Sequence, residues 1–263
     1  MSPIYQSVPP TAEPLNLTAV KNHLRVDSTD DDDLIRALIR TARRQCEPFT
    51  GRQLVCATWV IQADGLGAME LTPPPLIEIA SITYIDADAA TQTEAASVYE
   101  AIQYEFVPYV QLAYNQTWST VRGHTNDVTV TYRAGYATPF TAVAATGIMT
   151  WSGRSPTDTD AVRLSNSGGD LPSPLVVDRT YYVVTTVGAT CQLSLTSGGA
   201  AITLTDAGTG THFVGEVPAD MLAGMLLYIG HLYENREATI DGKLVAIPYG
   251  VEALWYPERV MAV

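Results

Sequence analysis

Lysine is almost absent from this chain of 263 residues. Of its 15 basic residues only Lys21 and Lys243 are lysines, and the rest are arginines. Acidic residues number 28, so the formal net charge is -13 at pH 7. Such a charge repels phosphate and disfavours bulk attraction to nucleic acid. The protein could still surround DNA without gripping it.

Cysteine is also scarce. The three cysteines, Cys46, Cys56 and Cys191, show no C-x-x-C spacing and have no histidine beside them. A disulfide framework or a zinc site is therefore disfavoured. We expect reduced, buried thiols.

Catalytic signatures are missing as well. The four histidines are scattered, none stands beside a serine or cysteine in a catalytic motif, and neither G-x-S-x-G nor H-E-x-x-H occurs. We therefore predict no catalytic centre, no cofactor and no required metal. Because the members of a catalytic triad need not be contiguous, a small hydrolase stays open as an alternative.

Long apolar runs and targeting signals are absent too. No segment approaches the roughly 18 apolar residues of a membrane-spanning helix. The first ten residues lack the basic and apolar regions of a secretory signal. We expect a soluble protein that is made in the cytoplasm and has no membrane partner.

Two longer helices stand out by the spacing of their apolar residues. One follows Asp30 and ends at Gly51, and the other starts at Pro218. A short helix capped by Thr18 precedes them. We expect the helices at 31–47 and 219–237 to face one another. Their apolar stripes comprise Leu34, Ile35, Leu38, Ile39, Ala42 and Cys46 in the first, and Met221, Leu222, Met225, Leu226, Ile229, Leu232 and Tyr233 in the second.

Strands are predicted at 58–61, 77–85 and 128–132. In the last of these, valine and tyrosine alternate with threonine, which indicates one buried face. Residues 1–16 contain four prolines and are expected to form an extended arm.

Residues 137–216 differ in character from both flanks. They are rich in Gly, Thr and Ser, and short β-type runs at 161–165, 180–186, 191–196 and 202–205 predict a small antiparallel sandwich or barrel. Because loop tips tolerate long additions, we interpret this stretch as a domain inserted into a core made of 17–136 and 217–263. The predicted class is α+β: a small helical-bundle core with a short antiparallel β part, interrupted by a sandwich-like, all-β inserted domain.

Charged residues on the first long helix allow two interpretations each. Asp30 to Asp33 could bind a divalent cation, but the alternating acids and glycine of an EF-hand loop are missing. Stabilisation of the helix N-terminus is favoured. Opposite the apolar stripe, the arginines form either a solvated face or a contact face for an acidic partner or phosphate. These candidates are Arg36, Arg40, Arg43 and Arg44.

The C-terminal segment is apolar and aromatic after the last long helix. Such a segment needs a partner surface, and it either folds back on its own core or reaches another subunit. Its candidate contact residues are Ile247, Tyr249, Val251, Leu254, Trp255 and Tyr256.

Several of these segments resemble head–tail connector (adaptor) proteins of tailed bacteriophages. The similar segments are Leu15 to Asp27, the acidic helix start, Thr50-Gly-Arg52, Val128 to Tyr136, Leu232-Tyr-Glu-Asn-Arg-Glu237 and Pro248-Tyr-Gly-Val251. They cover about 17–136 and 217–257, in the order of the family. Within the inserted stretch, Leu171 to Leu175 and Thr180 to Val183 resemble a β module of phage structural proteins.

The resemblance implies a structural virion protein at the neck, made in the host cytoplasm. It implies a homo-oligomeric ring, usually of twelve copies, that docks on the portal protein and contacts tail or stopper proteins. DNA would pass through the ring without specific binding. The arginine face and the C-terminal segment would be candidate portal or subunit interfaces. A rival interpretation is a surface-binding module that recognises glycan or another virion protein through the inserted β domain.

Overall fold

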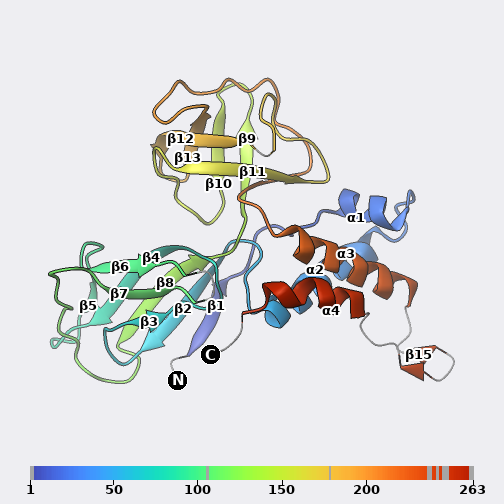
Figure 1. Cartoon of the computed structure of the whole chain (residues 1–263). Helices are drawn as coiled ribbons and strands as arrows, with labels where there is room; N and C mark the ends of the chain where they lie inside the picture. Colours follow the sequence, from blue (N-terminus) through green and yellow to red (C-terminus); the bar gives the residue numbers. More distant parts are fainter. Residues whose placement is uncertain are drawn as a thin grey trace.

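Three bodies make up the molecule: a bundle of helices, a part built on a five-stranded sheet, and a small closed barrel above both (Figure 1). The computed structural model describes residues 3–104, 107–177, 179–235, 239–240, 243–244 and 249–260. Helices and antiparallel sheets occupy separate regions of the chain, which confirms the α+β class.

The helical bundle contains α1 (Leu17–Leu24), α2 (Asp32–Thr50), α3 (Ala219–Glu234) and α4 (Tyr249–Trp255), and a 3-10 turn at Tyr256–Glu258 follows α4. The predicted packing of the two long helices is confirmed, because their buried side chains share one core. Leu38 and Leu226 lie at the margin of this core and are only partly buried. The buried set is Ile35, Ile39, Ala42 and Cys46 from α2, with Met221, Met225 and Ile229 from α3.

The helix ends agree with the sequence in part. Gly51 ends α2 in the left-handed conformation, at φ 69°, as predicted. Asn16, and not Thr18, caps α1, because its Oδ1 accepts a hydrogen bond from the Ala19 amide. Asp31 makes no side-chain cap, and Asp32 and Asp33 lie in the first turn of α2, where negative charge stabilises a helix.

The five-stranded sheet is antiparallel and larger than the predicted short β part. Its order is β1 (Ile4–Val8), β2 (Ala57–Ala63), β8 (Val128–Ala134), β4 (Leu76–Ile85) and β5 (Thr91–Thr93). A three-stranded sheet beside it has the order β3 (Met69–Glu70), β7 (Tyr109–Leu112) and β6 (Tyr99–Ile102). The predicted strands are β2, β4 and β8, and the N-terminal arm supplies the edge strand β1.

The barrel has six strands and a hydrophobic core of its own. The strands are β9 (Thr138–Val143), β10 (Ile148–Trp151), β11 (Ala161–Ser167), β12 (Thr180–Val187), β13 (Thr190–Ser194) and β14 (Thr211–Val214). Three of the four predicted runs form β11, β12 and β13. The run 202–205 is not a strand, although Ile202 and Leu204 still pack against the barrel core. Of the two predicted architectures, sandwich and barrel, the chain forms the barrel.

The chain enters and leaves the barrel at neighbouring points. Strands β9 and β14 pair with each other, and Thr138 lies opposite Val214. A Cβ at Gly215 would lie 2.2 Å from the Tyr136 carbonyl oxygen, so no larger residue fits there. Phe213, from a barrel strand, packs in the core of the helical bundle.

Beyond α3, β15 (Thr239–Ile240) and β16 (Lys243–Leu244) pair as a two-stranded antiparallel sheet. Among the described helices, none is both long enough and apolar enough to span a membrane.

Candidate interaction surface on helix α2

The four candidate arginines of α2 differ in their surroundings. Arg36 is exposed and lies 2.9 Å from Asp33, one turn earlier. Arg43 is largely buried between two carboxylates. Arg40 and Arg44 are exposed, and neither makes a hydrogen bond or ion pair with a residue that the structure describes. Arg40 and Arg44 are therefore the two candidates whose charge no described residue compensates.

Arg43 connects the N-terminal arm to α2. Its Nε and Nη2 donate to the two carboxylate oxygens of Glu13, at 2.7 and 3.1 Å, and its Nη1 donates to Glu47 at 3.0 Å. Burial lowers the pKa of Arg43, but the hydrogen bonds and charges of Glu13 and Glu47 outweigh it and leave that pKa raised. Arg43 therefore has a structural role, because a bidentate pair with carboxylate fixes the arm in place.

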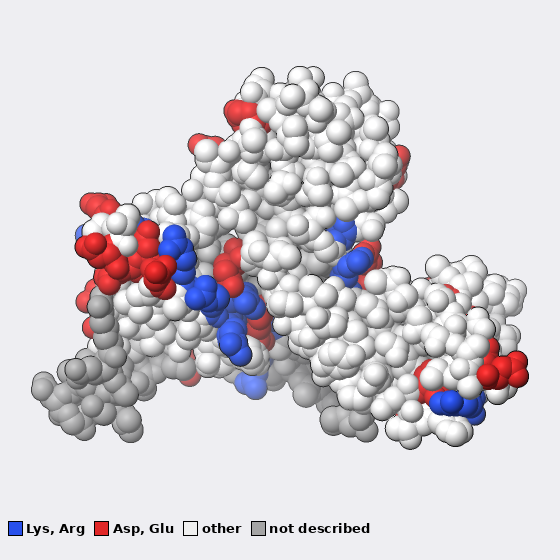
Figure 2. Space-filling model, turned by 180° about the vertical axis from the view of Figure 1, so that it is seen from behind, with Lys and Arg blue, Asp and Glu red and all other residues white. Residues whose placement is uncertain are grey.

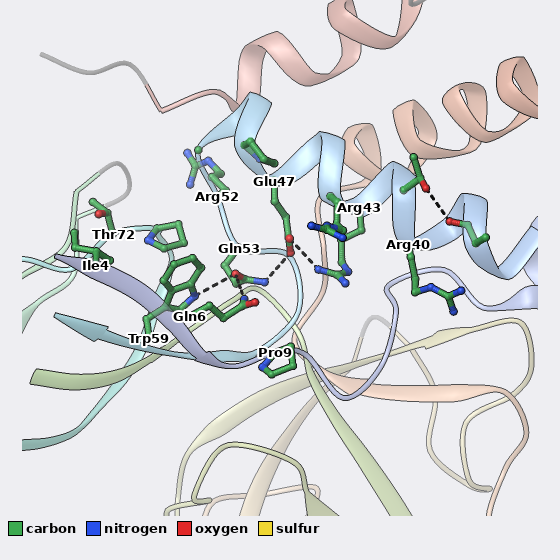
Figure 3. A pocket seen from close by; sticks show the side chains of 16 residues that line it. Ile4, Gln6, Pro9, Arg40, Arg43, Glu47, Arg52, Gln53, Trp59 and Thr72 are labelled. Carbon is green, nitrogen blue, oxygen red and sulfur yellow. Dashed lines mark hydrogen bonds and ion pairs between the residues drawn. The ribbon is translucent and has the colours of Figure 1, made fainter. Parts of the chain in front are cut away.

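Glu47 continues this network toward the sheet. It accepts hydrogen bonds from Gln53 Nε2 at 2.6 Å and from the Leu54 amide at 3.3 Å. Gln53 Oε1 in turn accepts from Trp59 Nε1 on β2, at 3.2 Å. Burial raises the pKa of Glu47, although Arg43 partly opposes the shift. The network thus holds α2 against the five-stranded sheet (Figure 3).

A groove of about 940 Å³ lies where α2 meets β1 and β2. One wall carries Arg40, Arg43 and Arg44 of α2, with Arg52 at the helix end (Figure 3). The other wall is largely apolar and includes Ile4, Trp59 and Pro73. In Figure 3 the side chain of Arg40 points away from the Glu47 network. The groove can therefore receive a partner that combines negative charge with apolar surface.

Sequence reasoning missed the apolar wall of this groove. Trp59 lies in a predicted strand and Ile4 in the predicted arm, but no sequence signal joins them to α2. Arg52 belongs to the Thr50-Gly-Arg52 motif and is buried, donating to the Glu258 carbonyl oxygen at 2.5 Å. It therefore ties the C-terminal segment to the end of α2.

The arginine face stands out on an acidic protein. Figure 2 shows basic side chains in a line on this side of the molecule, running from an acidic cluster at the end of the helical part toward the middle. With a net charge of -13, most of the surface repels anionic partners, including other copies of the chain. Arg40 and Arg44 give the groove a local positive charge on this acidic surface.

The C-terminal candidates fall into two groups. Val251 and Trp255 are buried in the core of the bundle, and Trp255 Nε1 donates to the Met221 carbonyl oxygen at 3.1 Å. For these two residues, the first of the two predicted alternatives applies: the segment folds back on the core of its own chain. Tyr249 and Tyr256 are 83% and 58% exposed, and Leu254 is half-buried. Ile247 lies outside the described residues.

The three thiols are all buried and free. Burial raises the pKa of each, to about 11 for Cys56 and about 12 for Cys191. No group of three or more His, Cys, Asp or Glu side chains converges on a possible metal position within the described part of the chain.

Comparison with known proteins matches part of this architecture to a family. Residues 15–109 match the family model of the phage gp6-like head-tail connector protein. This segment runs from α1 and α2 through the strands β2 to β6, and over it the resemblance drawn from the sequence is confirmed. Among curated proteins, none matches the chain.

Solved structures extend the likeness to nearly the whole chain. A chain in the neck of an empty GTA particle, computed with C6 symmetry, is 14% identical with a TM-score of 0.57, over 99% of this chain and 97% of that one. A chain in the virion of a native gene transfer agent (GTA) particle is 14% identical, with a TM-score of 0.56, over 99% and 96%. A chain in the neck of a native GTA particle, computed with C12 symmetry, is 15% identical, with a TM-score of 0.54, over 100% and 97%.

These TM-scores establish a shared fold, and the coverage includes the barrel as well as the helices and sheets. Residues 15–109 therefore resemble the gp6-like connector family, and the likeness along the rest of the chain is one of fold.

Proposed function

We propose that this protein is a head–tail adaptor that forms a ring in the neck of a virion, between the capsid portal and the tail. The observation that carries the proposal is the connector-family match over α1, α2 and the strands β2 to β6, within a fold shared along 99% of the chain with a chain from a particle neck. Twelve copies would fit the C12 symmetry used for one of those necks. The chain would be made in the host cytoplasm and would have no catalytic role.

The charge of the protein suits a ring through which DNA passes. A channel that binds DNA would slow the passage of that DNA, whereas a net charge of -13 on each copy repels the DNA phosphates. In the proposal the ring lines the channel without specific contacts to DNA.

The exposed tyrosines of the C-terminal segment are the proposed contact with the portal. Tyr249 and Tyr256 present aromatic surface, which is typical of interface anchors. Truncation before Ile247 is a poor test, because it also removes Val251 and Trp255 from the core. Surface substitutions separate docking from folding.

Imaging of particle necks tests the location directly. A small tag inserted at Gly188, in the exposed turn between β12 and β13, would mark the barrel without entering its core. We expect tag density repeated around the neck, at the periphery of a ring. Particles with tagged protein elsewhere, or with none, would contradict the proposal.

Co-sedimentation with the portal protein tests the contact. The paired variant Tyr249→Ala/Tyr256→Ala should keep the wild-type melting temperature and lose sedimentation with the portal. Tyr114→Ala is the matched control, because Tyr114 is 89% exposed on the sheet part of the molecule. Equal sedimentation of all three proteins would show that this segment is not the anchor.

A second candidate function is adhesion through the barrel to glycan or to another virion protein. It is favoured by apolar side chains exposed on the barrel, among them Val176, Val177 and Val187. Binding of purified chain to a glycan array or to capsid, lost when these valines become serine, would support it. In that case the protein would be absent from the ring position.

A further inference from the structure

We propose that the groove beside α2 receives the acidic segment Asp27–Asp33 of a neighbouring copy of the same chain. This inference rests on the proposed ring and names the contact that would join its subunits. One side of the proposed contact is the groove, which is lined by four arginines, Arg40, Arg43, Arg44 and Arg52. The other side is the segment 27–33, which contains five aspartates.

The groove holds positive charge that the chain itself does not neutralise. Glu13 and Glu47 compensate Arg43. Arg40 and Arg44 are one helical turn apart, so they project from the same side of α2. With no described partner for either side chain, two positive charges face the solvent on a protein whose net charge is -13.

The acidic segment has the complementary surplus. Within it Asp32 pairs with Lys21 at 2.7 Å, and Asp33 pairs with Arg36. Asp27 and Asp30 are exposed, and the side chain of neither pairs with any residue in the described part of the chain. Two uncompensated carboxylates thus match two uncompensated guanidiniums.

The two surfaces cannot meet within one copy. Asp32 at the start of α2 and Arg44 are twelve positions apart along the helix, a length of about 18 Å. Figure 2 shows the acidic cluster at the end of the helical part and the basic line extending away from it. A head-to-tail contact that repeats between successive copies uses different surfaces on each side, and it closes into a ring when the rotation allows.

A second copy is favoured over DNA as the occupant. Copies of net charge -13 repel each other, so a contact needs opposite charges placed where they orient the pair. Among the groove arginines, only Arg40 and Arg44 have no described partner, which is few for binding a phosphate backbone but equals the number of unpaired aspartates, Asp27 and Asp30, in the segment.

Disulfide trapping tests the contact in the purified full-length protein. Ser28 and Thr41 are exposed beside the two surfaces and carry no charge. We expect the Ser28→Cys/Thr41→Cys protein, oxidised at low salt, to give a ladder of bands beyond the dimer. Either single cysteine should stop at the dimer. The native thiols contribute little because they are buried.

Charge reversal in this cysteine background gives the decisive comparison. Arg40→Glu/Arg44→Glu should abolish the ladder, and adding Asp27→Arg/Asp30→Arg to the same chain should restore it. Arg163→Glu/Arg179→Glu changes the net charge equally at exposed barrel positions and should leave the ladder intact.

Other results would overturn the contact. A band pattern that stops at the dimer would indicate a two-fold contact between two copies. A ladder that persists when Arg40 and Arg44 are replaced by glutamate would exclude the groove as the contact surface. DNA retention that depends on these arginines while the ladder does not would assign the groove to phosphate. The two proposals fail by different results. A tagged chain absent from particle necks would contradict the proposed function, whereas only the disulfide ladder tests the contact between subunits.

Discussion

Asn16 and Ser167 are 151 residues apart in the chain and are joined by two hydrogen bonds. The Asn16 amide donates to Ser167 Oγ at 2.8 Å, and Asn16 Nδ2 donates to the Ser167 carbonyl oxygen. The same side chain caps α1 through Oδ1, 2.9 Å from the Ala19 amide. One asparagine therefore links the start of the bundle to strand β11 of the barrel.

Substitutions at this link should separate its two roles. Asn16→Ala removes the cap and one barrel contact, and we expect a loss of about 0.5–2 kcal/mol in unfolding free energy. Asn16→Asp keeps the cap acceptor but sets a carboxylate oxygen against the Ser167 carbonyl oxygen, so its stability loss should come from the barrel contact and not from the cap. Both variants lose the Nδ2 bond to the Ser167 carbonyl oxygen, so amide exchange in β11 should become faster. Equal protection of β11 in all three proteins would show that the link does not restrain the barrel.

We propose that the barrel is a separate folding unit, and its excision tests this. Replacing 139–212 with a short glycine linker joins Thr138 to Phe213, which lie on paired strands, and keeps Phe213 in the bundle core. The remaining chain should fold, and the piece 138–214 should melt cooperatively as β structure. The matched variant that also carries Phe213→Ala should lose roughly 3–5 kcal/mol. An aggregated remainder together with an unstructured piece would contradict separate folding.

Gly224 and Gly230 on α3 should respond differently to alanine. A Cβ at Gly224 would lie 2.3 Å from Trp255 Nε1, whereas one at Gly230 meets its nearest neighbour at 3.8 Å. Gly224→Ala should therefore displace α4 and lower the melting temperature. Gly230→Ala should be neutral or stabilising, because alanine favours helix by about 1 kcal/mol. Equal melting temperatures would show that the fold of α4 against α3 contributes little.

Removing Glu47 should weaken the attachment of α2 to the sheet. Glu47→Ala leaves Gln53 and Arg43 short of an acceptor at a site where the Glu47 side chain is only 14% exposed. We expect a loss of roughly 1–3 kcal/mol in denaturant unfolding. Arg36→Ala, which breaks an exposed pair, is the control and should change stability by less than about 1 kcal/mol. A Glu47→Ala protein as stable as this control would exclude the network as a support.

Asp127 should make stability depend on pH in the acid range. Arg122 and the His124 amide hydrogen-bond its carboxylate, and the Arg122 bond in particular holds the pKa of Asp127 below its ordinary value. A lowered folded-state pKa adds stability above the unfolded pKa of about 3.9, and this is lost as pH falls through the folded pKa. Wild type should exceed Asp127→Asn in stability at neutral pH, and the gap should narrow below about pH 4. Asp88→Asn controls for the loss of an exposed charge, and a gap that stays constant with pH would contradict the assignment.

The helical core was predictable because its residues repeat at helical spacing on both partners. The alternation of valine and tyrosine with threonine likewise predicted β8. By contrast, β9 contains a proline and β14 has four residues, so neither shows a clear pattern. The run 202–205 alternates like a strand but is not one; among the described residues, the only bridge nearby joins Ala201 to Ser194. Alternation also fits an extended segment whose apolar side chains, here Ile202 and Leu204, cover a barrel core.

The arginine face of α2 could be predicted, but the state of each arginine could not. Arg43 is neutralised by Glu13, which reaches it from an arm whose path is set by pairing of β1 with β2. Likewise, the aromatic content of the C-terminal segment predicted that it would contact another surface, but it did not show which of its residues point into the core. Trp255 enters the core because Gly224 leaves room for its ring, and such close approaches depend on tertiary packing.

The closure of the barrel matters most when many copies are crowded together. An open sheet exposes unpaired backbone groups that can template a neighbour's strand, and crowding promotes fibre-like growth from such edges. In this barrel β9 pairs with both β10 and β14, so the circuit of strands has no free edge. Closed barrels held side by side in an assembly can therefore collide at very high local concentration without pairing edge to edge or aggregating.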